Sequence, residues 1–266
     1  MEYVATALIV YAAVIALLYV IQRSLLYRPD QTIPDPAASG VPEMTALRLP
    51  TEDGLALLAW WRAPHEPSSP VLLVIHGNAG HIGDRAHKVR DYLDQGYGVL
   101  LLSYRYNAET GGSPSEANLF ADARMAVSYL RQEGVPDDRI VLFGESLGSG
   151  IAVAMAAEFP VGALVLEAPY SRMPDMAQHH YWYAPARWLV RDKFDSMSRI
   201  GKVSAPILVI HGEDDTVIPL KFGRRLFEAA PEPKQAHFLP EARHNNLIEY
   251  GMAGLVIEFL SRNLNR

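Results

Sequence analysis

The chain has no cysteine and little excess charge, and each of these absences removes a class of function. Without cysteine among its 266 residues, disulfide bonds, a thiolate nucleophile and cysteine-ligated zinc or iron–sulfur sites are excluded. The 24 Lys and Arg against 30 Asp and Glu give a net charge of −6. A mildly acidic chain lacks the basic surface that nucleic acid requires, so nucleic acid is not an expected partner.

Charged side chains are also missing from a long stretch near the N-terminus. Residues 3–21 are apolar apart from Thr6, and as a helix they reach about 28 Å, close to the thickness of a bilayer's hydrocarbon core. A buried core helix and a cleaved signal peptide are the alternatives, but acidic Glu2 is atypical of a signal peptide. We therefore expect residues 1–28 to hold a transmembrane or signal-anchor helix, with residues 3–21 in the lipid bilayer.

The positive charges beside this run predict its orientation. Arg23 and Arg28 follow the run, and no positively charged side chain precedes it. Because positive charge is retained on the cytoplasmic side, the sequence predicts a single-pass membrane protein whose main domain is cytoplasmic.

The remaining sequence alternates between strand and helix patterns. Residues 29–42 are rich in Pro, Asp, Ala and Gly and are typical of a linker, which leaves 43–266 as one domain. Asp53-Gly54 separates two extended runs and predicts a hairpin. Short buried strands alternating with helices then predict an α/β fold, a doubly wound and mostly parallel sheet behind an N-terminal antiparallel hairpin. The expected strands are 45–49, 55–61, 71–75, 99–103, 140–143, 163–166, 207–210 and 236–239, and the expected helices are 87–95, 116–134, 147–159, 222–230 and 247–264.

Two local patterns add detail to this expectation. Ser113-Pro114-Ser115-Glu116 combines a capping box with Pro at the first helical position. Residues 169–205 interrupt the alternation and predict a short helical insertion that contains Tyr170, Tyr181 and Trp182. This insertion either covers the sheet edge, lines a substrate pocket with its aromatic side chains, or touches the bilayer.

One motif in the chain carries a chemical prediction. Gly144-Glu145-Ser146-Leu147-Gly148 lies between a predicted strand and a predicted helix, which is the setting of a nucleophile elbow. A serine hydroxyl is a weak nucleophile and needs a base and an orienting carboxylate. In this arrangement the acid and then the histidine follow the serine along the chain, each after a strand.

The loops after the last two predicted strands supply the partners of Ser146. His244 follows the final strand and is the expected base, whereas the other histidines after Ser146 lie too early or within a strand. Asp215 is the expected acid, with Asp214 as its main rival and Glu167 as a third possibility.

Backbone amides are expected to bind the oxyanion. The amide of Leu147 at the start of a helix is one donor. The other is expected from the loop after the strand 71–75, through Asn78 or, next, Ala79. His76 in this loop is interpreted as structural, holding the turn by side-chain hydrogen bonds.

Together these segments resemble the α/β-hydrolase superfamily, and more narrowly its single-pass membrane-anchored branch, which includes protein depalmitoylases, fungal and plant cell-polarity hydrolases and bacterial hydrolases. The resemblance implies the nucleophile, acid and base roles for Ser146, Asp215 and His244. Its segments are the anchor with residues 22–27, His76 to Gly80, Tyr104-Arg105, Pro114 to Glu116, Gly144 to Gly148, His211 to Pro219 and His244-Asn245.

The expected function is a membrane-anchored serine hydrolase that cleaves carboxylic esters or thioesters without a metal ion or an organic cofactor. The apolar anchor and the aromatic insertion favour acylated, lipid-like substrates, and Ala79, Tyr170, Tyr181 and Trp182 are candidate pocket residues. An aminopeptidase-like enzyme is the first alternative, with Glu145 or Glu167 as the acidic site for a free amine. A catalytically silent membrane scaffold is the second.

Overall fold

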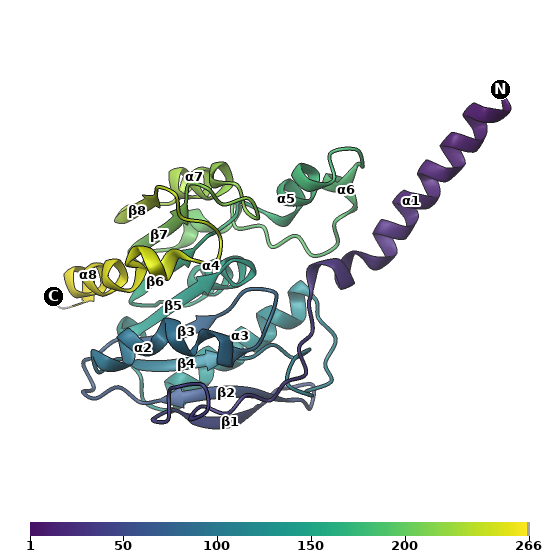
Figure 1. The fold of residues 1–266 in the computed structure, drawn as a ribbon. Coiled ribbons are helices and arrows are strands. Elements are labelled where there is room, and N and C mark those ends of the chain that lie inside the picture. Colours follow the sequence, from purple (N-terminus) through teal and green to yellow (C-terminus); the bar gives the residue numbers. More distant parts are fainter. Residues whose placement is uncertain (265–266) are drawn as a thin grey trace.

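The computed structural model describes residues 1–264, which form a three-layer α/β/α body with one long helix projecting from it (Figure 1). The eight strands form a single sheet in the order β1-β2-β4-β3-β5-β6-β7-β8. The pairs β1–β2 and β2–β4 are antiparallel, and every other pair is parallel. The predicted fold class and its leading hairpin are therefore confirmed. The strands are β1 (Thr45–Pro50), β2 (Ala56–Arg62), β3 (Val71–Ile75), β4 (Gly98–Leu102), β5 (Ile140–Glu145), β6 (Ala163–Glu167), β7 (Ile207–Gly212) and β8 (Lys234–Leu239).

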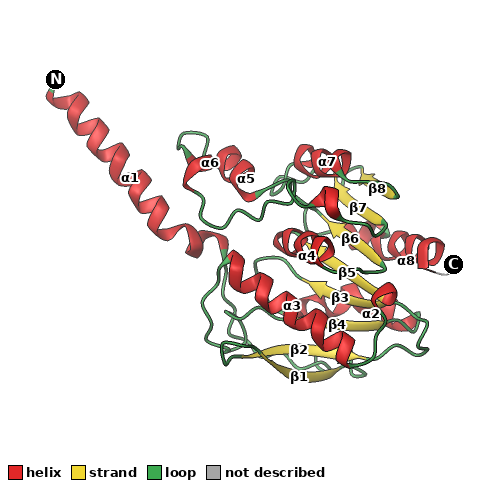
Figure 2. Ribbon diagram, turned by 180° about the vertical axis from the view of Figure 1, so that it is seen from behind, coloured by secondary structure: helices red, strands yellow, loops and turns green. Residues whose placement is uncertain are grey.

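Helices cover both faces of the sheet, because the central strands are apolar on both sides. The side chains of β3, β4 and β5 are all buried. One apolar core lies beneath α3 (Glu116–Gln132), α4 (Leu147–Glu158) and α7 (Leu220–Ala229). A second core lies beneath α2 (Ala86–Asp94) and α8 (Met252–Leu264) on the opposite face (Figure 2). The remaining helical elements are α1 (Glu2–Leu26), α5 (Met173–His180), α6 (Ala186–Leu189) and the 3-10 turns η1 (Ile82–Arg85), η2 (Asp137–Arg139), η3 (Ile200–Lys202) and η4 (Leu247–Tyr250).

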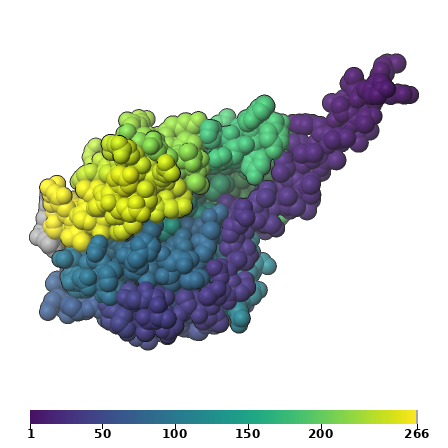
Figure 3. Space-filling model, in the orientation of Figure 1, coloured from purple at the N-terminus to yellow at the C-terminus, as the bar shows by residue number. Residues whose placement is uncertain are grey.

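Helix α1 lies largely outside the body, as the space-filling view shows (Figure 3). None of its residues is fully buried, so the alternative of a buried core helix is wrong. Its 25 residues reach about 37 Å at the α-helical rise. By length and composition, α1 is the one helix among the described residues that could cross a membrane.

One predicted helix and one predicted helix cap need correction. Residues 247–264 do not form one helix, because Gly251 adopts a left-handed conformation with φ of 80° between η4 and α8. Helix α3 begins at Glu116 as expected, but its N-cap is Ser115, whose side chain accepts a hydrogen bond from the amide of Asn118. Pro114 therefore precedes the cap and is not the first helical residue.

The insertion, residues 169–205, connects β6 to β7 and contains α5, α6 and η3. Figures 1 and 2 show α5 and α6 at the end of the body from which α1 departs. The insertion is fastened at its C-terminal part, where Asp192 accepts two hydrogen bonds from Arg23, of 2.8 and 2.9 Å, and one of 3.1 Å from the amide of Glu116. One buried carboxylate thus joins α1, α3 and the insertion.

Candidate active site

Ser146 occupies a strained turn between β5 and α4. Its backbone has φ of 51° and ψ of −116°, in a region that non-glycine residues rarely adopt. The flanking glycines make the turn possible, since a Cβ on Gly144 would lie 2.6 Å from Cα of Ser149 and one on Gly148 would lie 2.0 Å from the carbonyl oxygen of Ile75. The small residues of the motif therefore permit close contact between α4 and the sheet.

The loops after β7 and β8 bring an acid and a histidine to this serine. Nε2 of His244 lies 3.0 Å from Oγ of Ser146, and Nδ1 of His244 lies 2.7 Å from Oδ2 of Asp215. With an ionised Asp215, the Nδ1 proton is donated to the carboxylate, which leaves Nε2 free to accept the hydroxyl proton of Ser146. Of the three side chains named from the sequence, His244 thus lies within hydrogen-bonding distance of both Ser146 and Asp215.

Asp215 is held in its ionised form by surrounding donors. The amides of Val217 and Ile218 each donate to Oδ1 over 2.8 Å. Burial on its own raises the pKa of Asp215, but the hydrogen bonds from His211, His244 and the Ile218 amide outweigh burial and lower that pKa overall. The carboxylate therefore stays charged at neutral pH.

Among the described residues, neither rival acid is hydrogen-bonded to His244, whose ring nitrogens face Asp215 and Ser146. Asp214 is exposed. Glu167 is buried and accepts a 2.7 Å hydrogen bond from Lys88.

His211 is a supporting residue for which the sequence pattern indicated no separate role. Its Nε2 lies 2.8 Å from the carbonyl oxygen of Ile218 and 3.3 Å from Oδ2 of Asp215, so a proton on Nε2 serves both oxygens. The ring requires a glycine at position 223, where a Cβ would lie 2.2 Å from its Nδ1. The sequence feature that could have indicated this role is the position of His211 at the end of a strand, four residues before Asp215.

A buried group of charges lies beneath the elbow. Arg85 donates two hydrogen bonds to Glu145, of 3.0 and 3.2 Å, and Lys88 lies 3.4 Å from Glu145 and 2.7 Å from Glu167. Burial opposes the ionisation of Glu145, but Lys88 and Arg85 prevail and lower its pKa to about 2. Burial raises the pKa of Glu167, and Lys88 opposes this rise. Both carboxylates that were considered for binding a substrate amine are thus committed to cations of the chain itself.

The loop after β3 lies beside Ser146, as expected for an oxyanion donor. The side-chain amide of Asn78 donates to the carbonyl oxygen of Leu26 over 2.8 Å, and the Asn78 carbonyl accepts from the amide of Arg28 over 3.3 Å. Asn78 and Leu147 both line the cavity that contains Ser146. Leu147 is the first residue of α4, where amides have no partner within the helix.

His76 supports this loop differently from the expectation. Neither of its ring nitrogens has a hydrogen-bond partner among residues 1–264, so the predicted side-chain hydrogen bonds are wrong. The ring instead packs against Tyr104, with ring centres 4.4 Å apart. Burial lowers the pKa of His76 to about 3, and the ring is therefore neutral at pH 7.

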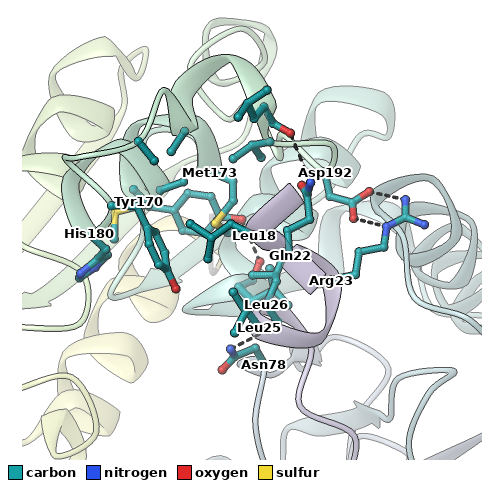
Figure 4. Close-up of a pocket in the computed structure, with 18 of the residues that line it drawn as sticks. Leu18, Gln22, Arg23, Leu25, Leu26, Asn78, Tyr170, Met173, His180 and Asp192 are labelled. Atoms are coloured by element: carbon teal, nitrogen blue, oxygen red, sulfur yellow. Dashed lines mark hydrogen bonds and ion pairs between the residues drawn. The ribbon is translucent and has the colours of Figure 1, made fainter. Parts of the chain in front are cut away.

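A cavity of about 540 Å³ opens above Ser146. Helix α1 forms one wall with residues from Ile15 to Leu26, and the insertion forms the other (Figure 4). Tyr170 and Tyr181 line the cavity as expected. Ala79 and Trp182 are exposed and lie outside the residues that line it, so these two pocket candidates are corrected.

The wall formed by α1 was not foreseen from the sequence. Its half-buried residues include Ile15, Leu18, Gln22 and Leu25, a spacing that places them on one helix face. The apolar run is uniform, so nothing in its sequence distinguished this face from the others.

No cluster of three His, Asp or Glu side chains that could hold a metal ion exists in the part of the chain that the structure describes.

Two family models and several curated proteins match the sequence. Residues 70–195 match the family model described as alpha/beta hydrolase fold, and residues 189–251 match the model described as serine aminopeptidase, S33. An uncharacterized protein of Mycobacterium tuberculosis is 39% identical over 247 residues, which cover 91% of this chain and 87% of that protein. Lysophosphatidylserine lipase ABHD12 of Danio rerio is 32% identical over 196 residues, which cover 66% of this chain and 51% of that protein. The match thus spans about half the length of the lipase.

Solved structures share the fold at low sequence identity. The esterase Pf2001 of Pyrococcus furiosus superimposes with a TM-score of 0.70 at 18% identity, over 90% of this chain and 98% of its own. The alpha/beta hydrolase GrgF of Penicillium superimposes with a TM-score of 0.69 at 17% identity, over 84% and 99% of the two chains. At such identities the likeness concerns the fold.

Proposed function

Since the chain belongs to the α/β-hydrolase superfamily, we propose that it is a membrane-anchored serine hydrolase that cleaves carboxylic esters or thioesters of acylated substrates. The observation that carries this proposal is the continuous hydrogen-bonded chain from Ser146 through His244 to Asp215. In a cavity next to a helix N-terminus, this arrangement is suited to acyl transfer.

The proposed reaction proceeds through an acyl-enzyme. His244 accepts the hydroxyl proton of Ser146 while Oγ attacks the acyl carbonyl, and Asp215 stabilises the resulting imidazolium. The amides of Leu147 and Asn78 bind the oxyanion. His244 then returns the proton to the leaving alcohol or thiol. Water, deprotonated in turn by His244, releases the acid and restores the serine.

The cavity walls favour an acyl chain as the group that is bound. Most of the lining residues are apolar, including Leu18, Leu25, Met173 and Met176. The relative ABHD12 is named a lysophosphatidylserine lipase, which is consistent with an amphiphilic substrate. We further propose that α1 anchors residues 43–266 to a bilayer, with that domain on the cytoplasmic side.

The aminopeptidase alternative is supported by one family match, but the acidic side chains that it would use already form ion pairs within the chain. Glu145 and Glu167, the acidic candidates for that site, are paired with Arg85 and Lys88. A substrate ammonium would have to compete with these buried ion pairs.

Substrate panels test the proposal on the full chain in detergent or nanodiscs. Acyl esters and thioesters of increasing chain length are expected to be hydrolysed, and aminoacyl amides much more slowly. Ser146→Ala should abolish turnover, whereas Ser198→Ala, which alters an exposed serine, should retain it. Equal turnover by the Ser146→Ala variant, or a preference for aminoacyl amides, would overturn the proposal.

A further inference from the structure

The insertion runs alongside the second half of α1. The hydroxyl of Tyr11 donates to the carbonyl oxygen of Tyr183 over 3.0 Å. Further along, the side chain of Gln22 donates to the carbonyl oxygen of Leu189 over 3.3 Å and accepts from the amide of Arg191 over 2.8 Å. The insertion therefore accompanies the helix from Tyr11 to Gln22.

All of this stretch of α1 except Gln22 falls within the proposed membrane span, residues 3–21. The 11 helical steps from Tyr11 to Gln22 correspond to about 16 Å, roughly half of the 30 Å hydrocarbon core. We call residues 181–190 the tip of the insertion. If residues 3–21 cross the bilayer, this tip lies at the depth of one leaflet and not in the water beside the membrane.

The surface of the tip matches that position. Residues 181–190 contain one charged side chain, Arg187, which donates to Asp175 over 2.9 Å. Trp182 and Trp188 are 78% and 79% exposed. Tryptophan is enriched where proteins meet the membrane interface. Exposed apolar surface that continues the face of a membrane helix indicates contact with lipid.

The backbone of the tip is also provided with internal partners, as a low-dielectric environment requires. The side chain of Gln178 donates to the carbonyl oxygen of Ala184 over 3.0 Å and accepts from the amide of Arg187 over 3.2 Å. Gln22 and the Tyr11 hydroxyl serve the other side of the tip through the contacts described above. Polar side chains thus satisfy backbone groups that loops in water leave to the solvent.

The cavity above Ser146 continues into the same region. Its lining includes Ile15 of α1 and Ala184 and Ala186 of the tip. We infer that residues 181–190 are embedded in one leaflet beside α1, and that the cavity receives acyl chains laterally from that leaflet. This inference rests on the proposed membrane anchoring.

Depth-dependent quenching of tryptophan fluorescence tests the inference on the full chain in phosphatidylcholine vesicles. The four tryptophans are Trp60, Trp61, Trp182 and Trp188. The first two are 0% and 9% exposed and lie within the sheet, where they provide a constant background. Lipids brominated at shallow and middle positions of the acyl chain should quench the wild type, and the double variant W182F/W188F should lose this quenching.

Flotation with the vesicles separates the two levels of the proposal. A protein that does not float with vesicles contradicts the anchoring. A protein that floats, but whose Trp182 and Trp188 are quenched by aqueous acrylamide and by none of the brominated lipids, contradicts only the inference.

The route of substrate entry is tested by activity. Trp182 and Trp188 lie outside the residues that line the cavity, so the variant W182S/W188S should hydrolyse a soluble short-chain ester at the wild-type rate. Its turnover of a long-chain acyl ester held in vesicles should fall by tenfold or more. If the variant hydrolyses the long-chain ester in vesicles at the wild-type rate as well, lateral entry is refuted.

Discussion

Replacing Asp215 by Asn changes one atom of the site, and the structure determines how the new amide must lie. Oδ1 of Asp215 accepts from the amides of Val217 and Ile218, each over 2.8 Å, while Oδ2 faces Nδ1 of His244 at 2.7 Å. Asparagine has a single acceptor oxygen, and the two amides require it at the Oδ1 position. The NH₂ group is therefore directed at His244.

This orientation reverses the polarity of the hydrogen bond to the imidazole. An NH₂ donor fixes the tautomer with a bare Nδ1 and a protonated Nε2, which can no longer accept the proton of Ser146. In a serine protease that has the same Ser–His–Asp arrangement on an unrelated fold, this change costs about 10⁴-fold in turnover. That factor corresponds to about 5 kcal/mol of lost transition-state stabilisation, and we expect a loss of that order for Asp215→Asn.

The assay is kcat/KM for a short-chain ester, with Asp214→Asn as the matched control. Asp214 is adjacent but exposed, so its amide should leave the rate within about threefold, since exposed substitutions have small effects. Unchanged near-ultraviolet circular dichroism would show that both variants are folded. The assignment of the acid is refuted if Asp215→Asn keeps a rate within tenfold of wild type.

Three further perturbations follow from the same geometry. Glu145→Gln leaves two buried cations short of a partner, so it should lower the stability by about 3 kcal/mol at pH 7 in chemical denaturation. The pKa of Glu145 in the folded protein is lowered from 4.5 to about 2, so the loss of stability in the variant should be complete above pH 4.5 and shrink as the pH falls toward 2. A loss of stability that does not change with pH would contradict the ion-pair explanation. Gly148→Ala places a methyl group 2.0 Å from a backbone oxygen and should lower both the melting temperature and the activity. Gly254→Ala is the control, because no atom lies within 4 Å of its new Cβ. This variant should leave both quantities unchanged or raise the stability. Leu18→Trp narrows the cavity and should reduce kcat/KM for long-chain esters at least about tenfold, because each CH₂ group of the acyl chain that the indole displaces costs about 0.8 kcal/mol. Leu17→Trp, on the exposed side of α1, should not reduce it. Equal effects of the two variants would argue against α1 as a pocket wall.

The architecture could be predicted from the sequence because its central strands are buried on both faces. Runs such as Val71–Ile75 are continuously apolar, bounded by turn residues and separated by helical periods. The errors fell at element ends, where one residue decides. Gly251 breaks the last helical stretch through its left-handed conformation. Ser115, not an earlier serine, caps α3.

Within the candidate site, the sequence indicated the residues that follow strands and missed those that depend on tertiary packing. Ser146 comes directly after β5, and Asp215 and His244 lie in the loops after β7 and β8. Parallel strands bring their carboxyl ends to one edge of the sheet. The role of α1 as a cavity wall and the exposure of Trp182 depend on how the insertion packs against the helix. No local pattern encodes that packing, because an apolar residue suits a pocket, a core and a bilayer equally well.

Covalent labelling tests most directly whether Ser146 is an activated nucleophile. The folded wild type, incubated with a fluorophosphonate probe in detergent micelles, should carry the probe on the peptide that contains Ser146, as located by mass spectrometry. Labelling should disappear in Ser146→Ala and fall strongly in His244→Ala, because the base that activates the hydroxyl is then missing. A folded wild type that does not react, or a Ser146→Ala variant that labels as well as wild type, would contradict the proposed chemistry.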